Sequence, residues 1–251
     1  TLGISAVQMG LSRHRRRSRT IYAWWLKRIR RESAYLNLIK LDHFRGIVAY
    51  GSVRSTEKDA SKARWNRGPG KEFFEYLQKH LGSLPFILED LGVITADVRK
   101  LRRQVGPGIK VFQFADFTDD PAESNHIYLP RNQVKDPRCV YYTGTHDNET
   151  LQQWVAESLS TTEQRNLKKY LSQSSEQGVN WQAIDMISAS AAERVIFPMQ
   201  DLLNLGKHAR MNHPSVAKGQ WRWRMTKEEF ASFGGNLGSH LREITHRHNR
   251  I

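Results

Sequence analysis

Short apolar runs alternate along the chain with polar loops and with segments of helical periodicity. The apolar runs predict five strands, at residues 37–41, 85–88, 110–114, 140–143 and 194–197. Apolar residues at helical spacing predict helices over about 21–36, 73–81, 96–104, 161–171 and 181–192, and a last helix that begins near Thr226. The polar segments 51–70 and 115–137 are expected to be long loops.

The order of these elements predicts an α/β fold with a parallel sheet. Strands that alternate with helices are typical of parallel βαβ units. The predicted strands are continuous apolar runs without polar alternation, which indicates strands buried on both faces. No internal repeat of short fixed period interrupts this pattern.

Polar residues with chemical potential follow four of the five predicted strands. Asp42 follows the first and Glu89 the second, while the fourth leads to residues 144–148 and the fifth to residues 198–201. In a β/α barrel the carboxyl ends of the strands meet at one face, which holds the active site. A retaining glycosidase needs one carboxylate to attack the sugar carbon and a second, about 5–5.5 Å away, to protonate the leaving oxygen. The spacing alone is a weak signal, because acidic residues at strand ends are often loop or helix-cap residues.

Composition favours a folded protein without a membrane span. Hydrophobic residues make up 39% and charged residues 25% of the chain, which is enough for a packed core. No window approaches 18 uninterrupted apolar residues, so we expect no transmembrane helix and no membrane partner. The N-terminus lacks an apolar signal core, and the single cysteine, Cys139, cannot form an internal disulfide. These features fit a reducing compartment, and we expect the cytoplasm.

The net charge of +14 first suggests a nucleic-acid partner, but its location weakens that idea. Residues 1–31 carry nine basic and no acidic side chains, whereas the rest of the chain carries 30 basic and 25 acidic ones. The run from Arg13 to Arg19 is either a nucleic-acid arm or targeting stretch, or a solvated basic tail, which we favour. Residues 68–71 lack the spacing of a phosphate loop. We therefore do not expect a nucleic-acid partner.

Several longer motifs occur in the order typical of one enzyme family. They are Tyr22-Ala23-Trp24-Trp25, Leu41-Asp42-His43-Phe44-Arg45-Gly46, Arg64-Trp65, Gly68-Pro69-Gly70, Leu88-Glu89-Asp90-Leu91-Gly92, Tyr142-Thr143-Gly144-Thr145-His146-Asp147-Asn148-Glu149-Thr150, Pro198-Met199-Gln200-Asp201-Leu202-Leu203, Arg210-Met211-Asn212 and Gly219-Gln220-Trp221-Arg222-Trp223-Arg224. On these motifs the chain, from about Thr20 onward, resembles the C-terminal half of the 4-α-glucanotransferases (amylomaltases or disproportionating enzymes, glycoside hydrolase family 77).

The resemblance implies an α/β fold of a particular kind, a partial TIM (β/α)8 barrel. The chain would supply about strands 4 to 8 with their helices, with the first three strands absent. Residues 1–19 would be a basic N-terminal segment that does not match the family, and residues 20–251 the C-terminal part of the catalytic barrel. Five strands cannot close a barrel, and an open edge favours association, so the oligomeric state is left open.

The resemblance also implies an activity, the transfer of α-1,4-glucan segments between maltooligosaccharides or glucans derived from starch or glycogen. The mechanism would be a retaining double displacement. Asp42 would form the covalent glucosyl-enzyme, Glu89 would act as general acid and then as general base, and Asp147 would stabilise the charged transition state. No metal and no organic cofactor are expected.

Further residues are assigned to substrate binding by the same resemblance: His146, Lys40, Arg45, Asn148, Asp201 and Asn212. Asp90 is expected to be a structural carboxylate. The seven tryptophans suit stacking on sugar faces, although each one alone is more often a core residue.

The chain departs from the family pattern at two positions. Lys40 stands where the family has an arginine, and Gly51 stands where it usually has a tryptophan. Lysine keeps the positive charge but lacks the planar fork that grips a carboxylate through two donors. The alternative prediction is therefore a catalytically inactive fragment or glucan-binding remnant, which would bind maltooligosaccharides weakly or not at all and without turnover.

Overall fold

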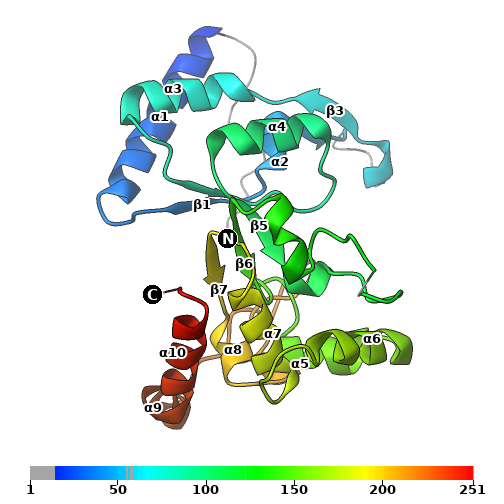
Figure 1. Cartoon of the computed structure of the whole chain (residues 1–251). Coiled ribbons are helices and arrows are strands. Elements are labelled where there is room, and N and C mark those ends of the chain that lie inside the picture. Colours follow the sequence, from blue (N-terminus) through cyan, green and yellow to red (C-terminus); the bar gives the residue numbers. More distant parts are fainter. Residues whose placement is uncertain (1–14, 55, 57–58, 122, 251) are drawn as a thin grey trace. The chain divides into compact units, whose positions relative to one another are not determined.

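A computed structural model describes residues 15–54, 56, 59–121 and 123–250, without the side chains of residues 15–19 and 60. The chain divides into two compact units, Thr1–Ile109 and Lys110–Ile251 (Figure 1), and each is described by itself. Residues 13 and 14 of the basic run lie outside the described residues. The choice between a tail and a binding arm therefore stays a prediction.

The first unit combines parallel strands with helices. Strands β1 (Ile39–Leu41), β4 (Phe86–Leu88) and β5 (Gly108–Val111), which reaches the division between the units, are parallel and hydrogen-bonded in that order. The helices are α1 (Arg15–Ser33), α2 (Arg45–Val48), α3 (Lys71–Leu81) and α4 (Ala96–Val105), with a 3-10 turn at Ala60–Lys62. Helix α1 begins before the expected residue 21, because arginine favours helices without adding to the apolar periodicity.

Aromatic side chains join the helices of the first unit to its strands. Helices α1 and α3 lie side by side (Figure 1), where Tyr22 meets Phe73 edge-on with ring centroids 5.4 Å apart. Phe74 of α3 meets Phe86 of β4 in the same way at 6.1 Å. Such pairs contribute about 0.5–1.5 kcal/mol beyond their burial. These contacts fix α3 over β4, whose three residues are all buried.

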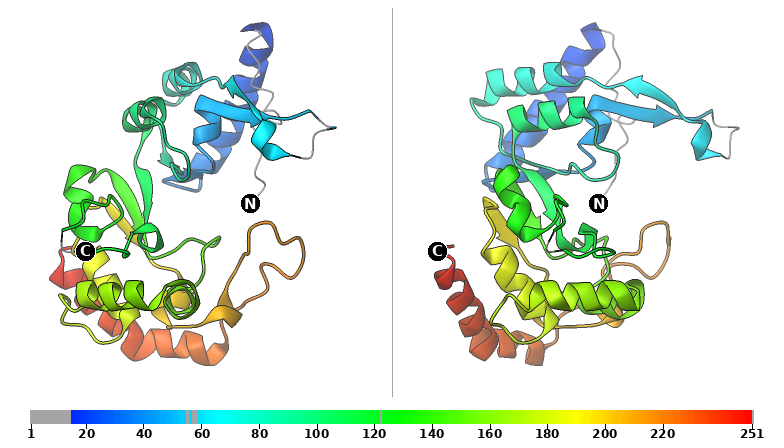
Figure 2. Two further views of the ribbon diagram at one scale, coloured as in Figure 1. Left: turned by 90° about the vertical axis from the view of Figure 1, so that its right-hand side faces the viewer. Right: turned by 45° about the vertical axis from the view of Figure 1, so that its right-hand side comes forward.

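The expectation of a long loop over residues 51–70 is wrong. Strands β2 (Ala49–Ser52) and β3 (Arg64–Arg67) form an antiparallel pair in which Ala49 lies opposite Arg67 and Ser52 opposite Arg64 (blue to cyan in Figure 2). These strands are only partly buried and rich in glycine, serine and arginine. They therefore lack both the apolar run and the alternation by which a strand is recognised from sequence.

The second unit contains β6 (Cys139–Tyr142), which follows β5 in the strand order, and β7 (Arg194–Ile196), parallel to β6. Its helical segments are α5 (Leu151–Gln153), α6 (Thr161–Leu171), α7 (Val179–Ser188), α8 (Met199–Leu202), α9 (Lys227–Ser232) and α10 (Gly238–Arg247), with π-helical turns at Trp154–Ser158 and Phe233–Leu237 and 3-10 turns at Phe112–Phe114, Pro130–Lys135 and Lys207–Ala209. Ser160, just before the helix predicted over 161–171, and Thr226, where the last helix is predicted to begin, both form capping boxes.

The third strand differs from its prediction. It ends at Val111, and residues 112–114, predicted as strand, form a 3-10 turn. Phe112 is fully buried there, with its ring 5.8 Å from that of Phe117 and 6.1 Å from that of Trp154. A short apolar run reports burial but does not distinguish a strand from a buried turn.

The predicted fold class, α/β with a parallel sheet, is confirmed, and the partial barrel stays a prediction. Within the described part of the chain, no helix combines the length and the apolar character needed to cross a bilayer.

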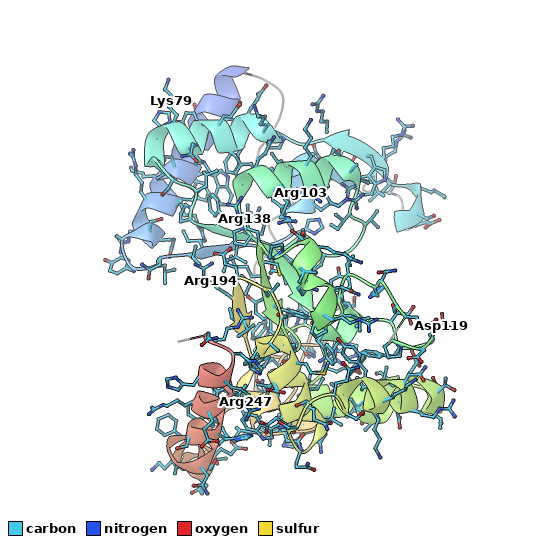
Figure 3. All side chains as sticks on the ribbon, in the orientation of Figure 1. Lys79, Arg103, Asp119, Arg138, Arg194 and Arg247 are labelled. Atoms are coloured by element: carbon cyan, nitrogen blue, oxygen red, sulfur yellow. The ribbon has the colours of Figure 1, made fainter. Side chains whose placement is uncertain are left out.

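A charge cluster around the buried carboxylates of Asp185 and Glu176 connects α10 to α7. The Oδ1 of Asp185 lies 2.7 Å from the His248 ring and accepts a hydrogen bond from Arg247 at 3.1 Å, while its Oδ2 accepts one from the Ser174 hydroxyl at 2.6 Å. Arg247, labelled on α10 in Figure 3, also donates to Glu176 at 2.8 Å. Burial alone raises the pKa of Asp185, but the hydrogen bonds from Ser174 and His248 and the neighbouring positive charges lower it overall.

Replacing Asp185 by asparagine removes this charge. We expect the free energy of unfolding at pH 7 to fall by about 1.5–3 kcal/mol, the range for hydrogen bonds to charged groups. Because the folded pKa lies below the unfolded one, the carboxylate stabilises the fold above about pH 4 and loses this effect as the pH falls through its lowered pKa. Urea denaturation between pH 7 and pH 3 measures the difference.

The matched control is Glu243→Gln on α10, whose side chain is 72% exposed and which we expect to change stability by less than about 0.5 kcal/mol. An Asp185→Asn protein as stable as wild type at pH 7, or a difference that grows with acidification, would contradict this account.

Candidate active site

The first unit places Asp42 and Glu89 side by side at neighbouring strand ends. Leu41 lies opposite Leu88 in the parallel pair of β1 and β4, so the next residue of each chain segment is one of the two carboxylates. The Glu89 N–H donates to the Leu41 carbonyl at 3.1 Å, and the Phe44 N–H donates to the Glu89 carbonyl at 3.2 Å. The backbone hydrogen bonds thus continue beyond the strands and fix where both carboxylates leave the sheet.

One ammonium group, that of Lys40, bridges both carboxylates. Lys40 and Asp42 are two residues apart on the extended chain and share a face. The Lys40 Nζ lies 2.6 Å from Asp42 Oδ1 and also donates to Glu89 Oε2. The three side chains are 30%, 35% and 24% exposed, respectively. Two carboxylates that share one Nζ have oxygens within about 5 Å of each other, which excludes the wider separation of inverting enzymes.

The surroundings give Glu89 an unusual proton affinity. Burial and a hydrogen bond with the Asp42 carboxyl raise the pKa of Glu89 to about 7, although the hydrogen bond and charge of Lys40 oppose this rise. Burial lowers the pKa of Lys40, but the two carboxylates outweigh it and raise that pKa above its ordinary value. The pKa of Glu89 therefore lies close to neutral pH, while Lys40 remains charged. A carboxyl group in this state can donate a proton and take one back.

The turn after Asp42 explains the motif that carries it. His43 has a φ of +48°, in the left-handed region that few residues other than glycine adopt. Its ring fills the space where a side chain on Gly46 would lie, since an added Cβ would be 2.9 Å from His43 Cδ2. Phe44 anchors the turn, fully buried with its ring 5.9 Å from that of Phe74. The turn thereby directs the chain from β1 into α2 and away from the carboxylates.

Arg45, predicted to bind substrate, contacts other protein groups in the structure. It is buried, its guanidinium lies 4.5 Å from the centre of the Trp65 ring, and it donates to the Thr95 hydroxyl at 3.4 Å. These contacts connect α2 to β3 and to the start of α4. Its contact with substrate stays a prediction.

Asp90 has the structural contacts expected for it. Its Oδ1 accepts a hydrogen bond from the Ile109 N–H at 2.8 Å, and its Oδ2 lies 3.5 Å from Arg102 Nε in a buried ion pair. Gly108 makes room for this carboxylate, since an added Cβ would lie 2.6 Å from Asp90 Oδ1. Asp90 therefore holds β5 beside β4 and so supports the strand that ends at Glu89.

The second unit gathers two of the predicted binding residues, His146 and Asn212, around Asp147. The Asn212 side-chain amide donates to Asp147 Oδ1 at 2.6 Å, and His146 Nε2 lies 3.3 Å from Oδ2. Asn212 is held in place because its N–H donates to the His146 carbonyl and Arg210 donates to the Asp147 carbonyl. The Trp221 ring lies 5.1 Å from that of His146. Asp147 remains half exposed, so its carboxylate is accessible to a ligand.

Asn148 and Asp201 accept hydrogen bonds from groups that flank the turn carrying Asp147. The Asn148 side-chain oxygen accepts hydrogen bonds from the Thr145 N–H at 2.9 Å and hydroxyl at 2.8 Å. The Asp201 carboxylate accepts the Leu151 N–H at 2.7 Å and the Thr143 hydroxyl, and burial raises its pKa to about 6 against the effect of these bonds. Both side chains position the turn that carries Asp147, and their contact with substrate stays a prediction.

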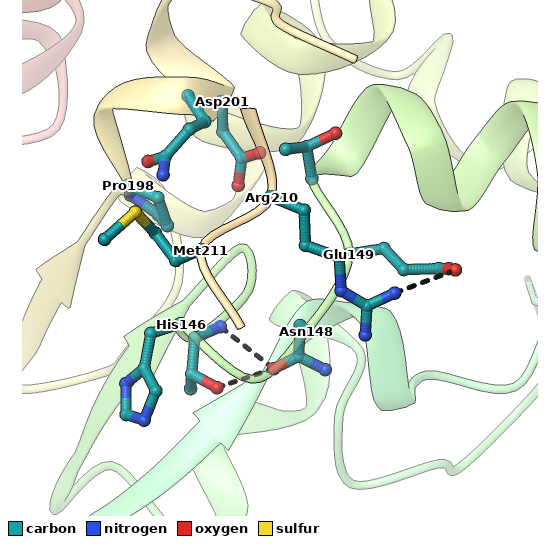
Figure 4. Close-up of a pocket in the computed structure, with 10 residues that line it drawn as sticks. His146, Asn148, Glu149, Pro198, Asp201, Arg210 and Met211 are labelled. Atoms are coloured by element: carbon teal, nitrogen blue, oxygen red, sulfur yellow. Dashed lines mark hydrogen bonds and ion pairs between the residues drawn. The ribbon is translucent and has the colours of Figure 1, made fainter. Parts of the chain in front are cut away.

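A small pocket of about 110 Å³ adjoins this turn (Figure 4). His146, Asn148, Glu149, Asp201, Arg210 and Met211 contribute to its lining. Arg210 lies 3.4 Å from Glu149, the ion pair drawn as a dashed line. Sequence reasoning did not single out these two residues, although both stand inside motifs that it quoted.

A close carboxylate pair at the strand ends of a parallel α/β sheet is the kind of site that glycoside-processing enzymes use. Comparison with known proteins makes the assignment specific. A family model described as 4-alpha-glucanotransferase matches residues 9–229, and the chain belongs to this family, glycoside hydrolase family 77. The match begins inside residues 1–19, the segment predicted to lie outside the family, and that division stays a prediction.

Individual relatives agree with this assignment. The chain is 41% identical over 233 residues to a 4-alpha-glucanotransferase of a Synechocystis species, covering 92% of this chain and 44% of that protein. A 4-alpha-glucanotransferase of Clostridium butyricum is 38% identical over 215 residues, with coverage of 85% and 43%. The amylomaltase from Streptococcus agalactiae, solved in complex with acarbose, superposes with a TM-score of 0.81 at 31% identity, with coverage of 90% and 44%. The chain thus spans less than half the length of these relatives.

The bridging position of Lys40 leads to a prediction for Glu89. Replacing Lys40 by methionine removes the one positive charge that lowers the Glu89 pKa, so we expect that carboxyl to titrate clearly above pH 7. Lys40→Arg keeps the charge and serves as the matched control, in which the Glu89 carboxyl should still titrate at about pH 7. Carbon-13 NMR of side-chain carboxyls measures both. A Glu89 pKa that stays unchanged or falls in Lys40→Met would show that the ammonium does not control it.

Proposed function

We propose that this chain carries the nucleophile and the acid/base catalyst of a 4-α-glucanotransferase, which transfers α-1,4-glucan segments between maltooligosaccharides or starch- and glycogen-derived glucans. The observation that carries the proposal is the Lys40 bridge between two adjacent carboxylates, one of which has a pKa raised to about 7. The names of the relatives support the substrate class.

In the first step, Asp42 attacks the anomeric carbon while protonated Glu89 donates its proton to the departing glycosidic oxygen. The glycosidic bond breaks, an ester forms between sugar and Asp42, and the shortened glucan leaves. In the second step, Glu89 takes a proton from the hydroxyl of an acceptor glucan, which attacks the same carbon and displaces Asp42. Transfer replaces hydrolysis when a glucan hydroxyl occupies the place of water.

The Asp42–Glu89 pair carries one negative charge both before and after the first step, and Lys40 lies against that charge in either state. Before the first step the negative charge lies on Asp42, and afterwards Asp42 is a neutral ester and Glu89 is the anion. Because the same Nζ contacts both side chains, it stabilises the anion in either state. We propose that this exchange allows a single lysine to serve where the resemblance leads one to expect an arginine fork.

Substrate contacts are proposed for the second unit as well. Asp147, with His146 and Asn212 bound to it, presents a half-exposed carboxylate suited to sugar hydroxyls and to the charge of the transition state. Arg45, Asn148 and Asp201 would support binding indirectly through the segments they hold. The acarbose complex of the amylomaltase relative supports an α-glucan ligand. The reaction balances with these groups alone, so we propose no cofactor.

A second candidate function follows from Lys40 itself. The Lys40 ammonium is a point charge shared by two carboxylates. It does not orient either carboxylate in the way that the two fixed donors of a guanidinium do. A protein that binds maltooligosaccharides without turnover is the outcome if this loss of orientation is decisive. The experiment below separates the two functions.

Incubation of the chain with maltotriose should produce glucose and longer maltooligosaccharides. Asp42→Asn should abolish the reaction, and Glu89→Gln should slow it by about 10²–10⁴-fold, the usual contribution of general acid–base catalysis. Product analysis by chromatography measures this, with the exposed Asp119→Asn as control. Binding of maltotriose without products would favour the second candidate, and an active Asp42→Asn protein would remove Asp42 from its role.

The pKa of Glu89 predicts the pH dependence of the first step. Only the protonated form donates, so the rate of transfer from maltotriose should fall as the pH rises through about 7. With α-maltosyl fluoride, whose leaving group needs no proton, formation of the glycosyl-enzyme should lack this decline and should survive in Glu89→Gln. Equal pH profiles for both donors would contradict the assignment of Glu89 as the acid.

A further inference from the structure

The first unit contains a pocket that is larger than the one beside the Asp147 turn. Neither Asp42 nor Glu89 lines it. Its volume of about 580 Å³ lies within the range of small-molecule sites. The walls come from β2 and β3, from the first residue of α3 and from α4. Its lining includes Ala49, Trp65, Arg67, Lys71, Lys100 and Gln104.

The pairing of β2 with β3 explains why this pocket is open. Ala49 lies opposite Arg67 and Gly51 opposite Trp65, and residues two apart on a strand share a face. On one face of the hairpin, the small residues Ala49 and Gly51 therefore lie opposite the large side chains of Arg67 and Trp65. Ala49 and Gly51 are too small to cover the indole opposite them, and Trp65 remains 62% exposed.

Trp65 is a braced stacking surface. The buried guanidinium of Arg45 lies 4.5 Å from its ring centre and supports the indole from one side. An indole held in this way offers a flat apolar surface at little cost in side-chain entropy. The CH face of a sugar ring or a planar base fits such a surface.

The uncompensated polar groups of the pocket are mainly donors. Among the described residues, Arg67 and Lys100 form no ion pair, and the Gln104 amide has no hydrogen-bond partner. Lys71 is paired with Glu75 at 2.5 Å. Asp97, the one carboxylate of the lining, already accepts hydrogen bonds from the Thr95 hydroxyl and the Val98 N–H. The pocket therefore favours a ligand that is rich in acceptors and negatively charged.

We propose that this pocket binds a sugar that carries a phosphate monoester, with the ring on Trp65 and the phosphate between Arg67 and Lys100. Trp65 and Arg67 stand two residues apart on one strand face, about 7 Å along the chain, a span that a hexose and its exocyclic phosphate can bridge. The Gln104 amide would donate to ring hydroxyls. The choice of a sugar rests on the proposed function. The source is either a free hexose phosphate or a phosphorylated unit of a glucan.

Equilibrium dialysis of the full chain with glucose 6-phosphate tests the site, with glucose, inorganic phosphate and adenosine monophosphate as competing probes. Glucose 6-phosphate should bind at least about tenfold more tightly than each of the other three, and more weakly as salt is added. Arg67→Gln and Lys100→Gln should each weaken binding about tenfold. Lys100 lies on α4, so its variant leaves the hairpin intact. Arg64→Gln, at the alternate position of β3, is the matched control and should bind as wild type does.

Other outcomes overturn the proposal. They are no binding of glucose 6-phosphate, binding no tighter than that of phosphate, tighter binding of adenosine monophosphate, or binding that both variants leave unchanged. A comparison of glucose 6-phosphate with phosphorylated maltodextrin identifies the source as the ligand that binds more tightly. Asp42→Asn should bind glucose 6-phosphate as wild type does. A chain that binds this ligand without transferring glucan would therefore refute the proposed function and leave this site standing.

Discussion

The parallel register of β1 against β4 is the constraint on which the candidate site depends. Leu41 opposite Leu88 makes Asp42 and Glu89 neighbours, and a slip of one residue would turn one carboxylate to the other face of the sheet. Burial of all three β4 residues and the hydrogen bond from Phe44 to Glu89 resist such a slip. The chemistry is thus set by apolar packing at the strands and only completed by the charged groups.

Once the register is fixed, electrostatics assigns the roles. Two carboxylates in contact cannot both ionise freely, and the more buried Glu89 retains its proton up to about pH 7. The ammonium of Lys40 opposes the rise in the Glu89 pKa, so this pKa lies lower than it would beside Asp42 alone. In the proposed mechanism, an acid and a nucleophile therefore arise from two similar side chains through differences in surroundings, as pKa tuning in enzymes generally works.

The sequence predicted those features that depend on local signals. Apolar runs located the strands that precede Asp42 and Glu89, and helical periodicity located α3, α4 and α6. The hairpin of β2 and β3 escaped prediction because its residues are too exposed to show a pattern. The bridge from Lys40 to Glu89 joins residues 49 positions apart, and no local pattern reports such a contact. Asn212 and Asp147 were connected only through the family resemblance, because their contact arises from the fold of the intervening chain.

Covalent trapping tests the central claim most directly. A slowly hydrolysed donor, such as a 5-fluoro-α-glucosyl fluoride, should leave one sugar ester on the protein, and peptide mass spectrometry locates it. The account predicts the label on Asp42, reduced strongly in Lys40→Met because the charge that stabilises the pair is missing. A label on Asp147 or Glu89, with Asp42 unmodified, would contradict it.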